Sequence, residues 1–262
     1  MLFCPLCSSS SGNSTFVEAN GFRFLIDAGV SAKRITELLE DIDIPVSTIQ
    51  GILITHEHAD HVSGIGILCK KYGIPVYADV ECFSKLPASI TNNIPTTCIR
   101  IFEPDHDFFL SKVRVFPFST PHDSARSVGF SIMAEGFKCT IMTDIGHFNN
   151  HLLAAASESD VLLIEANHDV DMLHAGPYPY PLKRRILSQT GHLSNEACGN
   201  ALVELYGTGV RNVILGHLSQ ENNTPELARI TVESILRAND IFDVNLAVAQ
   251  KDRSVGIFQI SG

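Results

Sequence analysis

The segment Thr55-His-Glu-His-Ala-Asp-His61 holds three histidines and two acids within six consecutive positions. The apolar run before it, residues 51–55, is typical of a strand that ends at the cluster. The segment is not the HExxH motif of zinc proteases, because aspartate stands at position 60 where that motif needs histidine. Imidazole and carboxylate together suit Zn²⁺, Mn²⁺ or Fe²⁺. The H-x-H-x-D-H spacing therefore predicts two neighbouring ion sites, with His56 and His58 at one and Asp60 and His61 at the other.

Two ions need more ligands than this segment holds. His122, Asp144 and His217 each follow a separate apolar run that we expect to be a strand. Loops at strand ends are where a rigid sheet can hold side chains in convergent positions. We therefore expect these three residues to complete the metal centre.

The order H-x-H-x-D-H, His, Asp, His resembles the metallo-β-lactamase superfamily, and the resemblance covers nearly the whole chain. It implies a layered α/β fold, a four-layer αββα sandwich of two mixed β-sheets, and we expect one such domain over residues 1–262. It also implies two divalent ions as cofactors. In this sequence the implied ligands are His56, His58 and His122 for one ion, Asp60, His61 and His217 for the other, and Asp144 as a bridge.

The elements that must position these residues alternate between short apolar strands and amphipathic segments, which is the pattern of a mixed α/β fold. No Pro-, Gly- or Ser-rich run indicates a linker between domains. The expected strands cover residues 15–18, 22–27, 51–55, 75–78, 97–102, 113–119, 127–134, 139–143, 161–165, 210–215, 244–249 and 255–260. The expected helices cover residues 32–40, 62–72, 148–157, 182–189, 195–206 and 224–238.

Composition limits the partners and the compartment. The net charge of −10 provides no overall cationic field for nucleic acid or anionic membrane, so any polyanion must be bound locally. Seven cysteines, an odd number, suit a reducing compartment. Cys4-Pro-Leu-Cys7 lacks a second ligand pair for zinc, so we expect two buried thiols. The sequence shows neither a secretion signal nor a membrane span, so we expect a cytoplasmic protein without membrane contact.

The resemblance implies hydrolysis by a hydroxide that bridges the two ions, with Asp60 and His192 as catalytic residues. His192 precedes the start of an expected helix. In the phosphodiesterase branch of the superfamily, a histidine in a similar place contacts the scissile phosphate and protonates the leaving oxygen. The alternative is a histidine that only caps the helix or packs in the core.

Small polar residues near the N-terminus are candidates for substrate binding. Ser10, Ser11, Gly12 and Asn13 expose N–H and hydroxyl donors that could hold an anion, although a solvated turn is the alternative. His168 follows an expected strand and either lines the pocket or has a structural role. The basic triplet 183–185 either guides a phosphate backbone or is surface charge.

The motifs SSSSGNS, LIDAG, THEHADH, TDIG, EANHD, GPYPYPLKRRILS and GHLSNE resemble the bacterial subfamily often called YycJ or VicX, a group of predicted metal-dependent nucleases. We therefore expect a phosphodiesterase, a nuclease or exonuclease, with nucleic acid or another phosphodiester as its substrate. The alternatives are a hydrolase of a thioester, lactone or cyclic phosphodiester, and a metal-dependent binding module. Redox diiron chemistry is disfavoured, because His58 replaces the glutamate of the diiron flavoprotein branch. Protein partners are left open.

Overall fold

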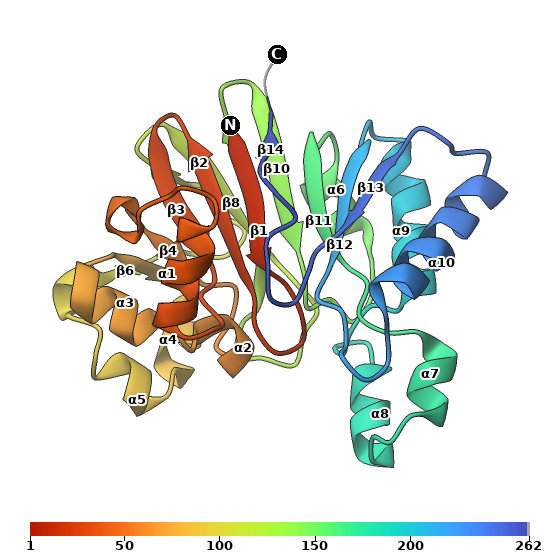
Figure 1. Cartoon of the computed structure of the whole chain (residues 1–262), viewed down its shortest axis with the longest axis horizontal. Helices are drawn as coiled ribbons and strands as arrows, with labels where there is room; N and C mark the ends of the chain where they lie inside the picture. The colour runs from red at the N-terminus through yellow and green to blue at the C-terminus, as the bar shows by residue number, and fades with distance from the viewer. Residues whose placement is uncertain (261–262) are drawn as a thin grey trace.

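The fold is taken from a computed structural model, which describes residues 1–260. Its framework is two β-sheets of seven strands each (Figure 1). The first sheet has the order β14 (Phe258–Gln259), β1 (Leu2–Cys7), β2 (Ser14–Ala19), β3 (Phe22–Ile26), β4 (Ile52–Leu53), β5 (Val76–Ala78) and β6 (Ile99–Ile101). The second has the order β13 (Asn245–Val248), β12 (Asn212–Gly216), β11 (Val161–Glu165), β10 (Phe137–Met142), β9 (Val128–Ala134), β8 (Val113–Ser119) and β7 (Phe108–Leu110).

Both sheets are mixed, and they are mixed in the same way. In the first sheet the pairs from β14 to β3 are antiparallel, and the pairs from β3 to β6 are parallel. In the second the pairs from β7 to β10 are antiparallel, and those from β10 to β13 are parallel. Parallel strands have their carboxyl ends on one edge, so each sheet presents several loops at the same edge.

The core has three parts, one between the sheets and one on the outer face of each sheet, because side chains along each strand alternate between its two faces. Phe24 and Ile26 of β3 pack between the sheets, whereas Leu25 packs outward. On β11, Leu163 packs between the sheets and Leu162 packs outward. Successive side chains of a strand point to opposite faces, so each sheet buries both of its faces. The layers are therefore helix, sheet, sheet, helix, which confirms the expected four-layer fold.

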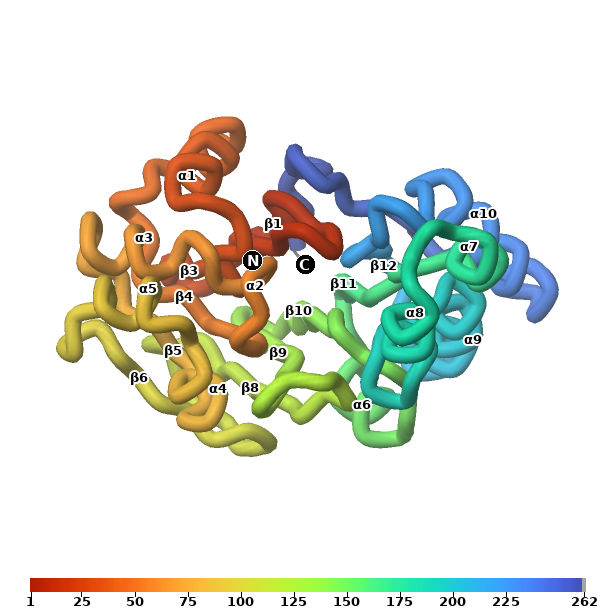
Figure 2. The backbone as a smooth tube through the Cα atoms, turned by 90° about the horizontal axis from the view of Figure 1, so that it is seen from below, coloured from red at the N-terminus to blue at the C-terminus, as the bar shows by residue number. Residues whose placement is uncertain are grey.

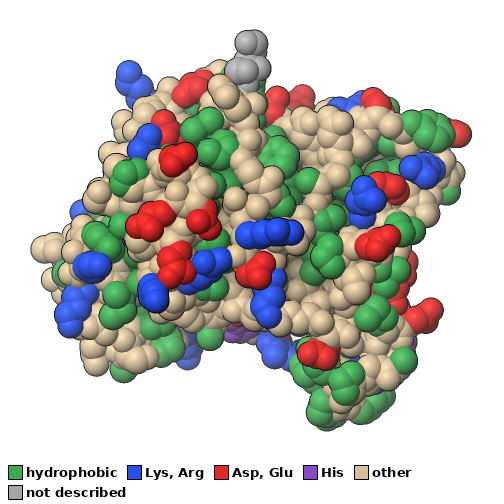
Figure 3. Space-filling model, in the orientation of Figure 1, with side chains coloured by type: hydrophobic (Ala, Val, Ile, Leu, Met, Phe, Trp, Pro, Cys, Tyr) green, Lys and Arg blue, Asp and Glu red, His purple; other side chains and the backbone are tan. Residues whose placement is uncertain are grey.

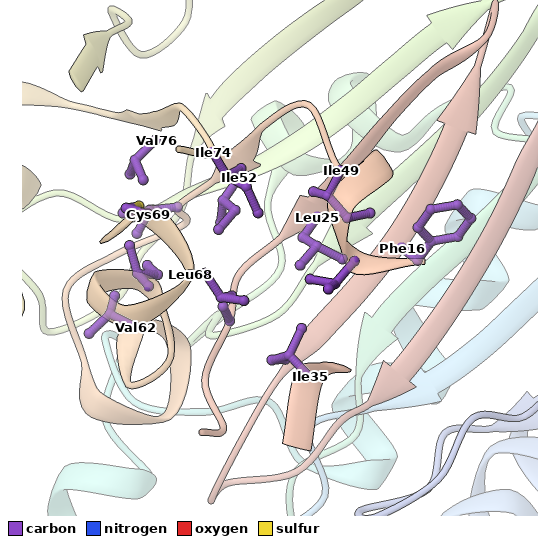
Figure 4. Packing of buried hydrophobic residues seen from close by; sticks show 14 of the residues in the cluster. Phe16, Leu25, Ile35, Ile49, Ile52, Val62, Leu68, Cys69, Ile74 and Val76 are labelled. Carbon is purple, nitrogen blue, oxygen red and sulfur yellow. The ribbon is translucent and has the colours of Figure 1, made fainter. Parts of the chain in front are cut away.

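Helices cover the outer face of each sheet (Figure 2). The helices beside the first sheet are α1 (Ala32–Glu40), α2 (Ala59–Val62), α3 (Ile65–Tyr72), α4 (Val80–Lys85) and α5 (Ala88–Thr91), with 3₁₀ turns at Val46–Thr48 and Thr96–Cys98. Those on the side of the second sheet are α6 (Asn150–Ala156), α7 (Val170–Ala175), α8 (Tyr180–Ile186), α9 (Asn195–Tyr206) and α10 (Pro225–Ala238). In the outer core of the first sheet, Phe16, Leu25 and Ile52 lie on strands that face Ile35 of α1 and Leu68 of α3 (Figure 4).

Local signals explain several boundaries. The hydroxyl of Ser194 accepts a hydrogen bond from the Ala197 N–H and so caps α9, and Thr224 caps α10 in the same way. The helix expected over residues 62–72 is interrupted between α2 and α3. At Gly64 a Cβ would lie 2.5 Å from the carbonyl oxygen of Val30, so the backbones approach too closely for any other residue.

The N-terminal segment forms β1, a strand that the sequence pattern did not predict. Cys4 and Cys7 lie on it as buried free thiols, as expected, and the other five cysteines are also free and buried. Within residues 1–260, no helix is long and apolar enough to cross a bilayer. The cytoplasmic location, and the extension of one domain over residues 1–262, stay predictions. The N-terminus and β14 lie toward the upper edge of Figure 1, whereas α2 and the α7–α8 segment lie toward the lower edge.

Candidate metal centre

The loops at one edge of the two sheets bring the predicted ligands together. His56 and His58 lie between β4 and α2, and Asp60 and His61 lie in α2. His122 follows β8, Asp144 follows β10 and His217 follows β12. The structure places all seven predicted ligands in overlapping groups whose ligand atoms lie within 4.8 Å of one another. Only His58 and Asp60 among them are partly exposed. The loops thus form one buried cluster that is open to solvent on one side.

One group consists of His56, His58 and His122. His58 Nδ1 lies 3.3 Å from His122 Nε2. His56 Nδ1 lies 3.0 Å from the Thr55 hydroxyl, and His122 Nδ1 lies 3.2 Å from the carbonyl oxygen of Gly191. Because their Nδ1 atoms are held from behind, both rings present Nε2 to the cluster.

A second group consists of Asp60, His61 and His217. Asp60 Oδ2 lies 3.4 Å from His61 Nε2 and 3.5 Å from His217 Nε2. Asp144 lies between the two groups, with Oδ2 3.3 Å from His61 Nε2 and Oδ1 3.6 Å from His122 Nε2. One carboxylate therefore reaches both groups with different oxygens, which is the position that a bridging ligand needs.

The donor set fits divalent metal ions. Two donors that share a tetrahedral zinc ion at the usual bond length of ~2.0–2.2 Å lie ~3.3–3.6 Å apart, which is the spacing of the atom pairs above. His56 Nε2 and Asp144 Oδ2 are buried, and neither has a hydrogen-bond partner among residues 1–260. Such orphaned atoms are costly in a protein interior unless a ligand satisfies them. Metal binding by these residues stays a prediction, as do the number and identity of the ions.

The ionisation states of three of these ligands favour cation binding, whereas at His61 and His217 burial is outweighed by neighbouring carboxylates, which raise the pKa of each well above its usual value. Burial by itself raises the pKa of Asp144, but His217, His61 and His56 outweigh it and hold that pKa well below its usual range. The pKa of Asp60 is likewise lowered, because His61 and His217 outweigh its burial. Burial lowers the pKa of His56 well below its usual value. Ionised carboxylates and a neutral imidazole are the forms that bind metal ions.

Asp27 supports the cluster from the first sheet. Its Oδ2 lies 2.7 Å from His61 Nδ1, and its Oδ1 accepts a hydrogen bond of 2.9 Å from the Thr55 N–H. This contact fixes the orientation of the His61 ring, so that Nε2 faces the cluster. In the same LIDAG motif, a Cβ on Gly29 would lie 1.6 Å from the Asp60 carbonyl oxygen, so only glycine fits. The sequence analysis assigned Asp27 no role, although its place at the end of an apolar run was a usable signal.

Glu165 supports the cluster from the second sheet. It ends β11 and is fully buried, with Oε1 2.7 Å from His192 Nδ1 and 3.3 Å from His217 Nδ1. Its Oε2 accepts hydrogen bonds from the backbone N–H groups of Ile145 and Leu193. From the sequence, Glu165 is a candidate functional group at the end of an apolar run, but one strand-end acid does not show which histidine it meets.

His192 lies at the edge of the cluster. Its side chain is 19% exposed, and its ring centroid lies 5.1 Å from that of His122 and 5.3 Å from that of His217. Burial lowers the pKa of His192, but Glu165 outweighs it and the net shift is upward. His192 and His217 in turn hold the pKa of Glu165 at about 2 against its burial. The Glu165 carboxylate therefore favours the protonated form of His192.

Three residues of the centre have left-handed backbone conformations. The φ angles are 61° at Asp27, 57° at Asp144 and 55° at His217. Asp27 and His217 directly follow a strand, and Asp144 lies two residues after the end of β10. Such conformations cost about 1–3 kcal/mol for residues other than glycine and persist where the surrounding structure enforces them. The sharp turn directs each side chain back toward the strand ends, where the cluster lies.

The predicted substrate-binding residues occupy different positions. Ser10 and Ser11 are exposed, whereas Gly12 and Asn13 are buried. Asn13 joins the loops, because its N–H donates to the Asp60 carbonyl oxygen at 2.9 Å and its Nδ2 donates to the Ser9 carbonyl oxygen at 2.9 Å. Substrate contact by these four residues stays a prediction.

His168 is also predicted to bind substrate, and it is 1% exposed. Neither of its ring nitrogens has a hydrogen-bond partner within the described part of the chain, and burial lowers its pKa to about 4. Its backbone bridges to Ser194 at the start of α9. Glu57, the other acid of the segment Thr55–His61, accepts a hydrogen bond of 2.7 Å from the Ala125 N–H.

Comparison with known proteins places the chain in a family. Residues 22–218 match the β-lactamase superfamily domain. The chain is 37% identical over 237 residues to "Exodeoxyribonuclease WalJ" of Streptococcus pneumoniae serotype 2 (strain D39), a match that covers 90% of this chain and 88% of that protein. It is 35% identical over 234 residues to "Exodeoxyribonuclease YycJ" of Bacillus anthracis, with 89% and 88% covered.

A solved structure supports the fold independently. The metallo-β-lactamase fold protein YhfI from Bacillus subtilis superposes with a TM-score of 0.73 at 17% identity, over 97% of this chain and 98% of that one. At this identity the likeness concerns the fold alone. With the domain match and the two relatives, it shows that the chain belongs to the β-lactamase superfamily.

Proposed function

We propose that this chain is a metal-dependent phosphodiesterase that cleaves nucleic acid, with DNA as its first candidate substrate. The observation that carries the proposal is the Glu165–His192 pair beside the predicted ligands. Cleavage of a phosphodiester expels an alkoxide, which gains from a positioned proton donor. The names of the two relatives, both exodeoxyribonucleases, support DNA as the substrate.

The residues that would hold the ions are His56, His58 and His122 on one side, Asp60, His61 and His217 on the other, and Asp144 between them. When bound, divalent ions supply a water acidic enough to attack at neutral pH and offset negative charge on the scissile phosphate. The donor set is compatible with Zn²⁺, Mn²⁺ or Fe²⁺.

His192 has the position of a general acid, and the Glu165 carboxylate raises its pKa. Glu165 Oε1 lies 2.7 Å from His192 Nδ1, and His192 Nε2 has no hydrogen-bond partner within residues 1–260. As the bond between phosphorus and the leaving oxygen breaks, the Nε2 proton passes to that oxygen. The resulting neutral imidazole regains its proton from water, and the Glu165 carboxylate stabilises the protonated form.

The test is cleavage of end-labelled single- and double-stranded DNA and RNA by metal-stripped protein that has been reloaded with Mn²⁺ or Zn²⁺. We expect wild type to cut and His192→Ala to be slowed by about 10²–10⁴-fold, the usual contribution of a general acid. A substrate with a p-nitrophenolate leaving group needs no proton, so His192→Ala should cleave it at close to the wild-type rate. If the reloaded protein binds metal but cuts no polynucleotide, the nuclease proposal is wrong, and thioesters, lactones and cyclic nucleotides are the next substrates to test.

A further inference from the structure

A cavity of about 170 Å³ lies directly beside His192. One wall comes from strand-end loops and includes Ser10, Asn167 and Ser219. The opposite wall comes from the segment that joins α7 to α8 and from α8 itself. Tyr178, Leu182 and Arg185 are its main residues. Because His192 belongs to this lining and to one of the candidate metal groups, the cavity opens next to the proposed proton donor.

The helical wall stands out from the body of the molecule. In Figure 3 the lobe formed by α7 and α8 projects at the lower edge, and histidine side chains are visible in the recess beside it. The lobe is held in place by specific contacts. Arg185 forms a two-point ion pair with Asp123, the neighbour of His122. Lys183 Nζ donates to the carbonyl oxygens of His174 and Gly176 at 2.7 and 2.8 Å.

Two members of the basic triplet 183–185 make these contacts. Lys183 and Arg185 are engaged within the protein, and Arg184 is the only member that is exposed without an ion-pair partner among residues 1–260. Arg185 therefore fixes the lobe to the loop of His122, and Lys183 joins α8 to the end of α7. A wall that is fixed before the substrate arrives loses little conformational entropy on binding.

The chemistry of the cavity suits a flat, polar, uncharged ring. Tyr178 and Leu182 offer an aromatic and an aliphatic face. Within the described chain, no hydrogen-bond partner is found for the hydroxyls of Ser10 and Tyr178 or for the amide oxygen of Asn167. No carboxylate lines the cavity, in a chain of net charge −10. The lining thus combines a stacking surface with free hydrogen-bonding groups and has no negative charge to repel a nucleotide.

The size of the cavity limits what can enter it. Water occupies about 30 Å³ per molecule in the liquid, so the cavity has the room of several waters. Sites for whole drug-sized molecules are larger, at about 300–1,000 Å³. One nucleobase fits this space, whereas a stack of bases or a duplex end does not.

We propose that this cavity binds the nucleobase of the nucleoside that carries the leaving oxygen. The proposal rests on the proposed function, because it takes His192 as the donor to that oxygen. The nucleoside attached to the leaving oxygen must lie next to His192, and the cavity is the lined space at that position. A base in the cavity is neither paired nor stacked on its neighbour in the strand, so cleavage requires the base at the scissile bond to be free of its duplex.

The test compares oligonucleotides with and without a base at the cleavage point. Short strands carry one abasic tetrahydrofuran residue at the first or the second position from each end. Stacking of a base on an aromatic side chain is usually worth a factor of roughly ten or more. We expect an abasic residue on the leaving-group side to lower kcat/KM by about that factor, and one on the other side of the scissile bond to change it less than about twofold.

The matched variants are Tyr178→Ala and Tyr180→Ala. Tyr180 is 73% exposed and lies outside the cavity lining. Tyr178→Ala should cleave the base-bearing strand at the slow rate of the abasic strand and leave the abasic rate unchanged, whereas Tyr180→Ala should behave as wild type. The unchanged abasic rate also shows that the variant is folded and active.

The failure of this proposal is distinguishable from the failure of the proposed function. If wild type cuts no phosphodiester, the proposed function is wrong and the base subsite is rejected with it. If wild type cuts abasic and base-bearing strands equally well, the nuclease assignment stands and the base subsite alone is rejected. The same rejection follows if Tyr178→Ala retains the full preference for a base.

Discussion

The two sheets supply the candidate metal centre in different ways. The first contributes four ligands from the single segment His56–His61, which follows β4. The second contributes His122, Asp144 and His217 from three strand ends that are far apart in the sequence. In the first case spacing along the chain sets the geometry. In the second case the pairing register of the sheet sets the geometry of the ligands. The metal centre therefore depends on local structure in the first sheet and on long-range strand pairing in the second.

The supporting carboxylates differ in the same sense. Asp27 lies behind one predicted ligand, His61, in the first half. Glu165 contacts a predicted ligand, His217, and also the proposed proton donor, His192. In the proposed function, the first sheet therefore has a part in ion binding alone, whereas the second has a part in both ion binding and proton transfer.

The largest effect is expected at Asp144, which reaches both ligand groups. Asp144→Asn should abolish detectable cleavage and reduce the retention of all bound metal, whereas His58→Ala should reduce metal retention on one side only. Metal content after dialysis, measured by plasma mass spectrometry, tests this directly. Asp171→Asn, at an exposed acid on α7, is the control. An Asp144→Asn protein that keeps its full metal content would remove Asp144 from the bridging position.

A smaller effect is expected at the two supporting carboxylates, and it should differ in kind. Partners that orient metal ligands typically contribute about 10–100-fold to metal affinity or activity. Asp27→Asn should weaken metal affinity and be rescued by added metal. Glu165→Gln should lower kcat even at saturating metal, because His192 loses the charge that keeps it protonated. Titration of activity with Mn²⁺ separates the two variants, and identical rescue of both would contradict the division of roles.

The smallest effect is expected in the loop before β7. Asp105 accepts hydrogen bonds from the Ser119 N–H at 2.9 Å and the Ser119 hydroxyl at 2.7 Å, and it pairs with His151 at 3.1 Å. These contacts outweigh its partial burial and lower its pKa. A lowered carboxyl pKa stabilises the fold above the unfolded-state value of about 3.9 and ceases to do so as the pH falls through the folded-state value.

Asp105→Asn should therefore cost up to ~1 kcal/mol of unfolding free energy at neutral pH, as an exposed network allows. The difference from wild type should shrink in acid, as the pH falls below the unfolded-state pKa of about 3.9 and through the lower folded-state pKa. Urea unfolding of metal-free protein at both pH values measures it. A difference that is the same at both would show that the charge of Asp105 plays no part.

The sequence predicted more of the first half of the site than of the second. The local pattern of His56–His61 suggests metal binding by itself, and the resemblance to a superfamily located His122, Asp144 and His217. The fold and the family are confirmed. The roles of Asp27 and Glu165 could not be predicted, because each depends on which histidine a separate loop brings within about 3 Å. The cavity beside His192 could not be predicted from the sequence either, since its lining combines strand-end loops with the α7–α8 lobe.

The left-handed residues after β3, β10 and β12 bear on when the ligand set can form during synthesis of the chain. A residue other than glycine adopts the left-handed conformation at a cost, so we expect these residues to keep it only once the neighbouring strands are paired. The last of these residues, His217, also lies late in the chain, and β12 pairs with β13, which is made later still. A nascent chain therefore has no complete set of donors to offer an ion, because the second sheet is finished only near the end of synthesis. We therefore expect the full ligand set to form only after β13 is made and paired with β12, so that the proposed ion binding follows completion of the second sheet.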